Sequence, residues 1–275
     1  GEFQGYMGAP KINPSPIEYF WHSISTQEQK KRMNLFLPVE FSNLNLDQQG
    51  FIYVTESGLA GNDSIKRLNP TGSDELRRTV HYGTEVQERT GLHYPVGVFA
   101  LRSENRSQFV DIISREFGGY SVLDKRWGRV FTYDSNSNFL YVFGNSGNKE
   151  GSFINPVALA SNNNLFYVLD NKKGGLHVFR KTEYASLIHK ALKLYDTGKY
   201  EESTETWKQV LYYNINFDLA YTGIGRSYLR KENYAKAMEY LKAGNNREAY
   251  SEAYRYFRRN LLHKNFNSII YIILT

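Results

Sequence analysis

Short runs of Val, Tyr, Phe and Ile, separated by turns rich in Asn and Asp, occupy the chain before residue 185. Such runs predict β-strands. The clearest four cover 109–114, 120–124, 128–133 and 139–143. The segment 134–138, Asp-Ser-Asn-Ser-Asn, predicts a turn, because Asn and Asp accept left-handed backbone conformations and bond their own backbone. We therefore expect small antiparallel sheets in this region.

The strand pattern repeats along the chain. Tyr120-Ser-Val-Leu-Asp124 and Phe166-Tyr-Val-Leu-Asp170 lie 46 residues apart, and a more diverged copy at 52–56 lies 68 residues before the first of these. The longer offset implies an insertion of about 22 residues. Four strands in about 46 residues, repeated, is the size of a β-propeller blade. We predict about three four-stranded blades over 38–184, at 38–80, 81–151 and 152–184. The last of these ends after its third strand, at Arg180.

From residue 185 the hydrophobic pattern changes to a period of 34 residues. Small residues recur at matching positions with large residues between them, which is typical of helix pairs that stack on their neighbours. The matched pairs are Ala191 and Gly225, Leu194 and Tyr228, Tyr200 and Tyr234, Ser203 and Ala237, and Trp207 and Leu241. We predict helical repeats over 185–264, with turns at 198–199 and 232–233 and a capping helix over 246–264.

Both ends of the chain predict further segments. Residues 1–37 predict a stub of another blade and a helical insertion, since Ser25-Thr-Gln-Glu28 has the spacing of a capping box. The basic run 30–32 would lie on exposed turns of that helix. Residues 265–275 are largely apolar, but their longest apolar run of six residues is shorter than the about 20 that a membrane span needs. We expect either a frayed helix end or the start of a transmembrane helix there.

Composition narrows the class of protein. Aromatic residues make up 15% of the 275 residues, which supplies enough apolar material for a core. The formal net charge is +6, but Lys and Arg are scattered, which favours a solvated basic surface over a nucleic-acid site. No Cys is present, so disulfides and thiolate metal sites are excluded. The chain begins with Gly and shows no secretory signal, so we expect an internal part of a longer protein.

Spaced glycines mark one stretch of the predicted blades. The pattern Phe143-Gly-x-x-Gly-x-x-x-Gly-x-Phe-x-x-Pro156, followed by Tyr-Val-x-Asp170, resembles an NHL repeat. It departs from that pattern at Gly174 and Gly175, where an Asn and an Arg are usual. The 34-residue units resemble tetratricopeptide (TPR) repeats. The residues on TPR motif positions are Tyr221, Ile224, Gly225, Tyr228, Ala237 and Leu241. These resemblances imply a multi-domain β and α protein, with a partial NHL-type β-propeller followed by an α-helical TPR-like array.

The order of these parts resembles a group of Firmicutes membrane proteins, often labelled gluconolactonase-like, in which a Yip-type domain follows the repeats. The resemblance covers nearly the whole chain. It implies a location on the extracytoplasmic face of the cell membrane, tethering through a segment beyond the C-terminus, and a partner-binding or sugar-related role. NHL propellers usually have about six blades. Because only three are readable, we expect an arc with open edges that is prone to self-association.

Candidates for catalysis or metal binding are few. Lactonases with a related propeller hold a divalent metal such as Ca²⁺ or Zn²⁺ through hard oxygen ligands, and here Glu56, Asp124 and Asp170 end equivalent strands. Their repetition favours a turn-forming role, because a residue that every blade needs recurs and a metal ligand usually does not. The six His lack metal-ligand spacing, and no nucleophile elbow or P-loop is present. We expect no catalytic residue and no cofactor.

Aromatic residues give better candidates for a binding site, because they stack on sugar rings and grip peptides. Trp127 occupies a predicted turn beside Lys125, Arg126 and Arg129, and its counterpart in the next unit is Lys173, so the fold does not demand Trp there. Four tyrosines of the helical repeats are candidates to line a groove: Tyr195, Tyr212, Tyr213 and Tyr221. Local packing of Trp127 and core packing of the tyrosines are the alternatives.

Taken together, the patterns and the resemblance favour a non-enzymatic, extracytoplasmic binding or scaffold module of a membrane protein, linked to carbohydrate uptake or sensing. The expected partner is a protein or a glycan and not a nucleic acid. A metal-dependent sugar lactonase with its site in the propeller channel is the alternative. A structural spacer between propeller and membrane is a further alternative.

Overall fold

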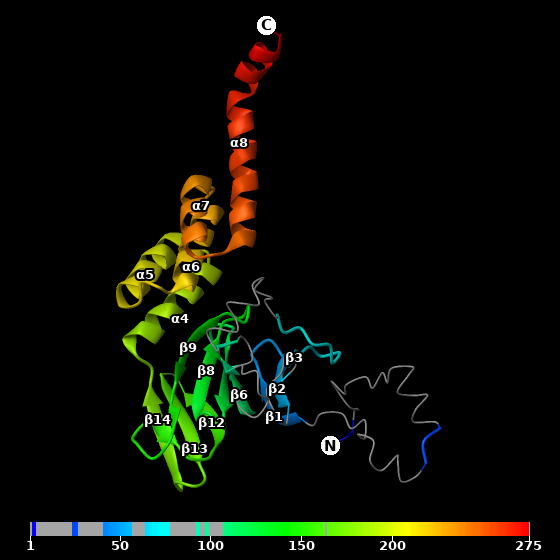
Figure 1. The fold of residues 1–275 in the computed structure, drawn as a ribbon, viewed down its shortest axis with the longest axis vertical. Helices are drawn as coiled ribbons and strands as arrows, with labels where there is room; N and C mark the ends of the chain where they lie inside the picture. The colour runs from blue at the N-terminus through cyan, green and yellow to red at the C-terminus, as the bar shows by residue number, and fades with distance from the viewer. Residues whose placement is uncertain are drawn as a thin grey trace. The chain divides into compact units, whose positions relative to one another are not determined.

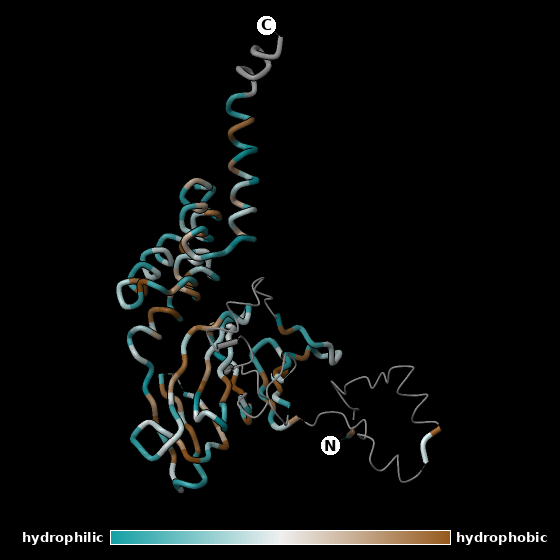
Figure 2. The backbone as a smooth tube through the Cα atoms, viewed as in Figure 1, coloured by the Kyte–Doolittle hydropathy of each residue, from teal (hydrophilic) through white to brown (hydrophobic). Residues whose placement is uncertain are grey.

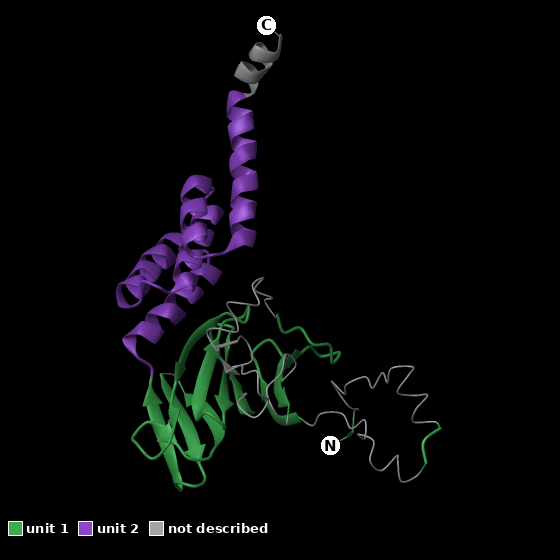
Figure 3. Cartoon of the chain, in the orientation of Figure 1, with its two compact units in different colours: residues 1–180 green, residues 181–275 purple. Residues whose placement is uncertain are grey.

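The computed structural model describes residues 2–3, 24–26, 41–56, 64–77, 92–93, 97–98, 107–162 and 164–274. The chain forms two compact units, Gly1–Arg180 and Lys181–Thr275 (Figure 3). Within the described residues the first unit carries several antiparallel sheets and the second carries five α-helices, so the fold is mixed β and α. The predicted stub and helical insertion of 1–37, with the basic run 30–32, lie outside the described residues apart from 2–3 and 24–26.

Within the described residues of the first unit, three antiparallel sheets of three or four strands follow one another, each with its strands in chain order (Figure 1). The first sheet contains β1 (Phe41–Leu46), β2 (Ile52–Glu56) and β3 (Ile65–Leu68). The middle sheet contains β6 (Phe109–Ser114), β7 (Tyr120–Asp124), β8 (Arg129–Tyr133) and β9 (Phe139–Phe143). The last sheet contains β12 (Pro156–Asn162), β13 (Leu165–Asp170) and β14 (Gly175–Arg180). Two short pairs join β4 (Leu92–His93) to β5 (Gly97–Val98) and β10 (Asn145–Ser146) to β11 (Ser152–Phe153).

The four strands predicted over 109–143 are confirmed. The turn predicted at 134–138 is confirmed too, because Oδ1 of Asp134 accepts the backbone N–H of Asn136 (2.9 Å) and of Asn138 (2.7 Å). The described part of the first sheet has three strands, one fewer than a four-stranded blade predicts. The last sheet also has three, which agrees with the expectation that this unit ends after its third strand at Arg180. After β14 the chain turns directly into helix α4, which leaves no residues for a fourth strand in chain order.

The first strand of each sheet shifts its register at the same place. The shifts lie between Phe41 and Asn43 in β1, between Phe109 and Asp111 in β6, and between Pro156 and Ala158 in β12. A bulge of this kind inserts one extra residue into a strand. Phe109 and Ile112, three positions apart, therefore belong to the same core.

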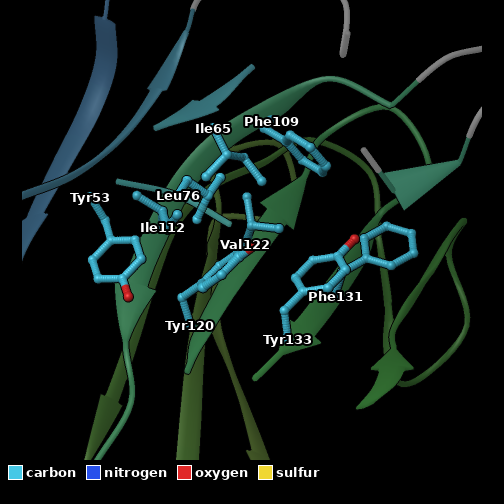
Figure 4. Close-up of a cluster of buried hydrophobic side chains, with 9 residues drawn as sticks. All are labelled: Tyr53, Ile65, Leu76, Phe109, Ile112, Tyr120, Val122, Phe131 and Tyr133. Carbon is cyan, nitrogen blue, oxygen red and sulfur yellow. The ribbon is translucent and has the colours of Figure 1, made fainter. Parts of the chain in front are cut away.

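The middle sheet is buried on both faces. The first core lies between the first and middle sheets (Figure 4) and contains Tyr53, Ile65, Leu76, Phe109, Ile112, Tyr120, Val122, Phe131 and Tyr133. The second core, shared with the last sheet, contains Ile113, Leu123, Val130, Phe153, Leu159, Phe166 and Val168. Successive strand residues point to opposite faces, so Val122 enters the first core and Leu123 the second. Each fully buried side chain of this size stabilises the fold by about 1.5–3 kcal/mol.

The second unit consists of α4 (Glu183–Asp196), α5 (Tyr200–Tyr213), α6 (Asp218–Arg230), α7 (Tyr234–Ala243) and α8 (Arg247–Leu274). The predicted turns at 198–199 and 232–233 are confirmed. Three helices begin at side-chain caps. Thr182 accepts the backbone N–H of Ala185 (3.2 Å), Asn233 accepts that of Lys236 (3.3 Å), and Asn246 accepts that of Ala249 (3.0 Å). Such caps satisfy backbone donors that the first helical turn leaves unpaired.

Small residues lie where neighbouring helices meet, as the 34-residue period predicts. Ser203 of α5 is fully buried and donates Oγ to the carbonyl oxygen of Ala191 on α4 at 2.9 Å. Gly225 of α6 lies so close to α7 that a Cβ on it would stand 2.6 Å from Cγ of Leu241. The small side chains thus set the approach of the helices, and large ones such as Trp207 fill the space between them.

Helix α8 passes without a break through residue 264, where the prediction placed the end of the capping helix. Its side chains over 258–265 are all exposed, and Figure 2 shows this stretch as mainly hydrophilic with one short hydrophobic segment. Among the helices of the described residues, none combines the length and the apolar character that a membrane crossing requires.

Candidate binding site

The predicted turn with Trp127 connects β7 to β8 and is organised by Asp124. Oδ1 of Asp124 accepts the backbone N–H groups of Gln108 (3.0 Å), Arg126 (2.9 Å) and Trp127 (3.3 Å). Gly128 closes the turn with a φ of 60°, and a Cβ there would lie 2.6 Å from the carbonyl oxygen of Asn145. The turn therefore needs an acceptor at its start and a glycine at its end.

The same turn recurs 46 residues later, between β13 and β14. The carboxylate of Asp170 accepts the backbone N–H groups of Ile154 (2.6 Å), Asn155 (3.2 Å), Lys172 (3.0 Å) and Lys173 (3.1 Å). Asp170 pairs with the first residue of β12, as Asp124 pairs with the first residue of β6. Both carboxylates thus hold a turn and the start of the inner strand together.

Asp124 and Asp170 differ in electrostatics although their turns match. Burial raises the pKa of Asp124, and this effect outweighs the hydroxyl of Ser107 and the backbone N–H groups that lower it. The pKa of Asp170 is lowered. Burial acts to raise it, but the hydrogen bonds from four backbone N–H groups together outweigh burial. Glu56, the third candidate ligand, forms an ion pair with Lys66 of β3.

The three candidate metal ligands lie at the ends of three different strands, each with partners of its own. Within the described ranges, no three His, Asp or Glu side chains come together in a way that could hold a metal ion. The carboxylate chemistry visible here is acceptance of backbone N–H groups by Asp124 and Asp170. The metal-dependent lactonase hypothesis therefore has no assembled ligand set among the residues that the structure describes.

The four candidate binding residues of the Trp127 turn lie together. Three of them, Lys125, Trp127 and Arg129, are half-buried, and Arg126 is exposed. The guanidinium carbon of Arg129 lies 5.8 Å from the centroid of the Trp127 ring, within cation–π distance. At the equivalent position of the next turn, Lys173 donates Nζ to the carbonyl oxygens of Ser152 (2.7 Å) and Lys149 (3.3 Å).

The four candidate tyrosines of the helical unit do not come together. Tyr195, at the end of α4, packs against Tyr200 (5.3 Å between centroids) and accepts Nε of Arg230 (3.4 Å). Tyr213, at the end of α5, packs against Tyr184 at the start of α4 (6.2 Å) and against the exposed Tyr212. Because α4 rises about 1.5 Å per residue, Tyr184 and Tyr195 lie about 16 Å apart along it. Tyr221 lies half-buried on α6.

A groove of about 540 Å³ lies on the helical unit instead. Its lining comes from α4, α5, α6 and the C-cap residue of α6: Lys190, Glu201, Glu202, Thr204, Glu205, Thr206, Gln209, Tyr228 and Lys231. None of the four candidate tyrosines lines it. The acidic cluster at the start of α5, Glu201-Glu202 with Glu205, is the sequence signal that could have pointed to this surface.

The acidic side chains that line this groove form ion pairs. Glu201 forms an ion pair with Lys231, and that hydrogen bond and charge lower the pKa of Glu201. Glu205 binds Nζ of Lys208 at 2.6 Å, and Glu202 lies 3.6 Å from Nζ of Lys199. Three glutamates and two lysines give the lining a formal charge of −1.

Aromatic packing fixes the single ring of the groove. Tyr228 stacks on Tyr240 with 5.6 Å between ring centroids, and Nζ of Lys236 lies 5.5 Å from the centroid of Tyr228. A ring held in this way loses little conformational freedom when a ligand packs against it. The groove thus offers acidic side chains, hydroxyl and amide groups and one supported aromatic ring.

No family model matches the chain, and no curated protein matches it. A solved streptogramin B lyase is similar at 11% identity and a TM-score of 0.30, over 54% of this chain and 43% of that one. Virginiamycin B lyase from Staphylococcus aureus is similar at 11% identity and a TM-score of 0.29, over 52% and 41%. A protein of unknown function from Bacteroides caccae is similar at 10% identity and a TM-score of 0.29, over 53% and 49%. The chain spans less than half the length of each of these three structures.

Proposed function

We propose that the chain is a non-enzymatic binding or scaffold module whose helical unit holds an extended peptide. The observation that carries the proposal is the groove of about 540 Å³ lined by α4, α5 and α6. Its volume lies in the range of ligand sites, about 300–1,000 Å³. Its lining is polar and charged, which suits the backbone of a peptide better than an apolar small molecule. Stacked helix pairs use surfaces of this kind to bind partners.

The groove lining indicates the chemistry of the peptide. The three glutamates outnumber the two lysines, and Glu201 and Glu205 already bind ammonium groups of this chain, Lys231 and Lys208. A Lys or Arg of the peptide would replace these flexible partners, while an apolar or aromatic side chain would pack against Tyr228. We therefore expect a basic peptide with at least one large apolar residue.

We also propose a repeat type for each of the two units and a cellular location for the module. The β unit is an arc of NHL-type blades, supported by the repeated Asp124 and Asp170 turns. The helical unit is a TPR-like array, supported by the close contacts at Ala191 and Gly225. We assign the module to the extracytoplasmic face of a cell membrane, tethered beyond its C-terminus, with a role in carbohydrate uptake or sensing. Trp127 is the contact residue that we propose for a glycan.

Selection from a phage-displayed library of random peptides tests the groove, with the full chain as bait. Enriched peptides are synthesised, and their Kd is measured by fluorescence anisotropy for three proteins. Glu201→Lys reverses a charge in the groove, and Glu248→Lys reverses an exposed charge on α8 outside it. We expect Glu201→Lys to raise Kd about tenfold or more and Glu248→Lys to leave it unchanged.

Two results would contradict the proposal. Peptides that bind the wild type and Glu201→Lys equally do not use the groove. A library that yields no enrichment favours the spacer hypothesis instead. Metal content, measured by mass spectrometry on the purified chain, addresses the lactonase hypothesis separately, since a stoichiometric divalent ion lost on Asp124→Asn would support it.

A further inference from the structure

Both outer faces of the β unit expose apolar side chains. On the last sheet, the face turned away from the second core exposes Leu169 (43% exposed), Leu176 (57%) and Val178 (55%). On the first sheet, the face turned away from the first core exposes Leu44 (68%) and Leu46 (62%). Apolar side chains that gather on a surface mark an interaction site more often than single exposed ones do.

The exposed face of the last sheet corresponds to the face of the middle sheet that is buried against the last sheet. By strand register, Leu169 and Leu176 are paired neighbours, as Leu123 and Val130 are in the middle sheet. Leu123 and Val130 are fully buried in the second core, where they pack against the following sheet. The outer face of the last sheet therefore has the residue pattern that receives a further sheet.

The exposed face of the first sheet corresponds to the face that, in the middle and last sheets, packs onto the preceding sheet. Leu44 pairs with Val54 as Ile112 pairs with Val122 in the middle sheet and as Leu159 pairs with Val168 in the last sheet. Ile112 and Leu159 are both buried against the preceding sheet. The outer face of the first sheet therefore has the pattern that packs onto a preceding sheet.

We propose that a second copy of this chain covers these faces, with the last sheet of one copy packed against the first sheet of the other. The contact resembles the two junctions already present inside the β unit. In each of them, the face that receives a following sheet meets the face that packs onto a preceding sheet. It is a heterologous contact, since it joins different faces. Made twice, it closes two arcs of three sheets into a ring of six and leaves neither face exposed. Closed propellers use about four to eight blades.

The proposed junction differs from the internal ones in its polar groups. Inside the unit, Asn45 accepts the backbone N–H of Ser114 (2.8 Å), and Asp111 accepts that of Leu159 (2.5 Å). In the last sheet the residues that match these two acceptors by register are Ala160 and Ala158. The junction between copies is therefore more apolar than the internal ones and lacks these two hydrogen bonds, so we expect reversible association that depends on concentration.

Sedimentation velocity over a concentration series tests this proposal, with the 31.9 kDa chain as the monomer reference. Leu176→Lys places a positive charge on the last sheet, and Leu44→Glu places a negative charge on the first. The wild type should form dimers, and each variant alone should dissociate about tenfold or more readily. An equimolar mixture of both should dimerise again, because one junction is unchanged and the other pairs Lys with Glu.

The control is Tyr212→Lys, which changes a side chain that is 90% exposed on the helical unit and should leave the dimer unaffected. Circular dichroism shows whether each variant stays folded, and a variant that unfolds is replaced by the milder Val178→Thr or Leu46→Thr. A wild type that remains monomeric at all concentrations overturns the proposal. So does a dimer that persists in both charged variants, or a mixture that fails to associate. These outcomes are independent of peptide binding in the groove.

Discussion

Oδ2 of Asp111 on β6 accepts the backbone N–H of Leu159 on β12 at 2.5 Å and so joins the first strands of the middle and last sheets. Oδ1 of the same carboxylate accepts the backbone N–H of Ile112 at 2.7 Å. Asp111 is buried, and burial raises its pKa although both N–H groups lower it. The residues that match it by register are Asn43 in the first sheet and Ala158 in the last, so the carboxylate occurs at this position only in the middle sheet.

Asp111→Ala should destabilise the β unit. The substitution leaves the N–H of Leu159 without this acceptor, and an unsatisfied buried donor costs about 1–3 kcal/mol. Urea unfolding measures the difference. Glu116→Ala, five residues further along the same hairpin and exposed, is the control and should stay within about 0.5 kcal/mol of wild type. Equal midpoints for the two variants would show that the bridge contributes nothing measurable.

Asp124→Asn and Asp170→Asn should differ, although the two residues stand at the start of matching turns. Asp170 uses both oxygens, with Oδ2 accepting the N–H of Ile154 and Oδ1 the other donors. An Asn there turns its NH₂ group toward a donor, which should cost about 1–3 kcal/mol. Asp124 uses Oδ1 for its three backbone donors, and Asn keeps that oxygen. Asp124→Asn should therefore cost less than about 1 kcal/mol in urea unfolding near neutral pH.

The pH dependence of these two variants should have opposite signs. The folded-state pKa of Asp170 lies below the ordinary value of 3.8, so its contribution to the free energy of unfolding is present above 3.8 and is lost as pH falls through the folded pKa. The folded-state pKa of Asp124 lies above 3.8, so stability falls as pH rises from 3.8 through the folded pKa.

Urea midpoints measured from acid to neutral pH check this expectation. On acidification, the stability difference between wild type and Asp170→Asn should shrink. Wild type gains from protonation of Asp124 as pH falls through its raised folded pKa toward 3.8, so Asp124→Asn should fall further behind wild type there. The Asp170 effect appears at lower pH, below 3.8. Parallel curves for the two variants would mean that the two carboxylates share one environment.

Local pattern was enough to predict the strands over 109–143 and the helix contacts at Ala191 and Gly225. Strand residues alternate between two faces, and small residues mark close helix contacts, so both signals lie within one segment. The bridge from Asp111 to Leu159 joins residues 48 positions apart, and no local pattern encodes it. Such groups come together only in the folded chain, when one sheet packs on the next.

The candidate site was harder to predict, because its signal is not periodic. Tyr195 and Tyr213 were expected to line a groove, yet Tyr213 packs against Tyr184 at the start of α4, whereas Tyr195 lies at the other end of that helix. The groove is formed by Glu, Thr, Gln and Lys side chains on three helices, and these residue types occur on any solvated helix face. The opposite pKa shifts of Asp124 and Asp170 are equally invisible in the sequence, since both residues stand in matching positions of one repeat.

Gly225→Ala should destabilise the helical unit despite the higher helix propensity of Ala. The added Cβ would lie 2.6 Å from Cγ of the fully buried Leu241 and 3.0 Å from its backbone nitrogen. Overpacking of this kind costs about 1–3 kcal/mol, more than the about 1 kcal/mol that Ala gains over Gly in a helix. Thermal unfolding followed by circular dichroism measures the change.

Leu241→Ala supplies the matching control for Gly225→Ala. Alone it creates a cavity and should cost about 2–5 kcal/mol. In the double variant the clash is gone, so the two changes together should cost less than the sum of the single ones. Additive costs would show that Gly225 and Leu241 do not share the contact that the geometry indicates.

Trp127→Lys should preserve the fold and remove the proposed glycan contact. Lys173 holds the matching position of the next turn, so a Lys fits the backbone there, and we expect a change within about 0.5 kcal/mol. Gly128→Ala, one residue further on, should cost more than about 1 kcal/mol, because φ is 60° and the Cβ would meet Asn145. Wild type and Trp127→Lys are compared on a glycan array after urea unfolding has shown equal stability. Glycans bound by wild type and retained by the variant would rule out Trp127 as the contact, and their loss at equal stability would assign it.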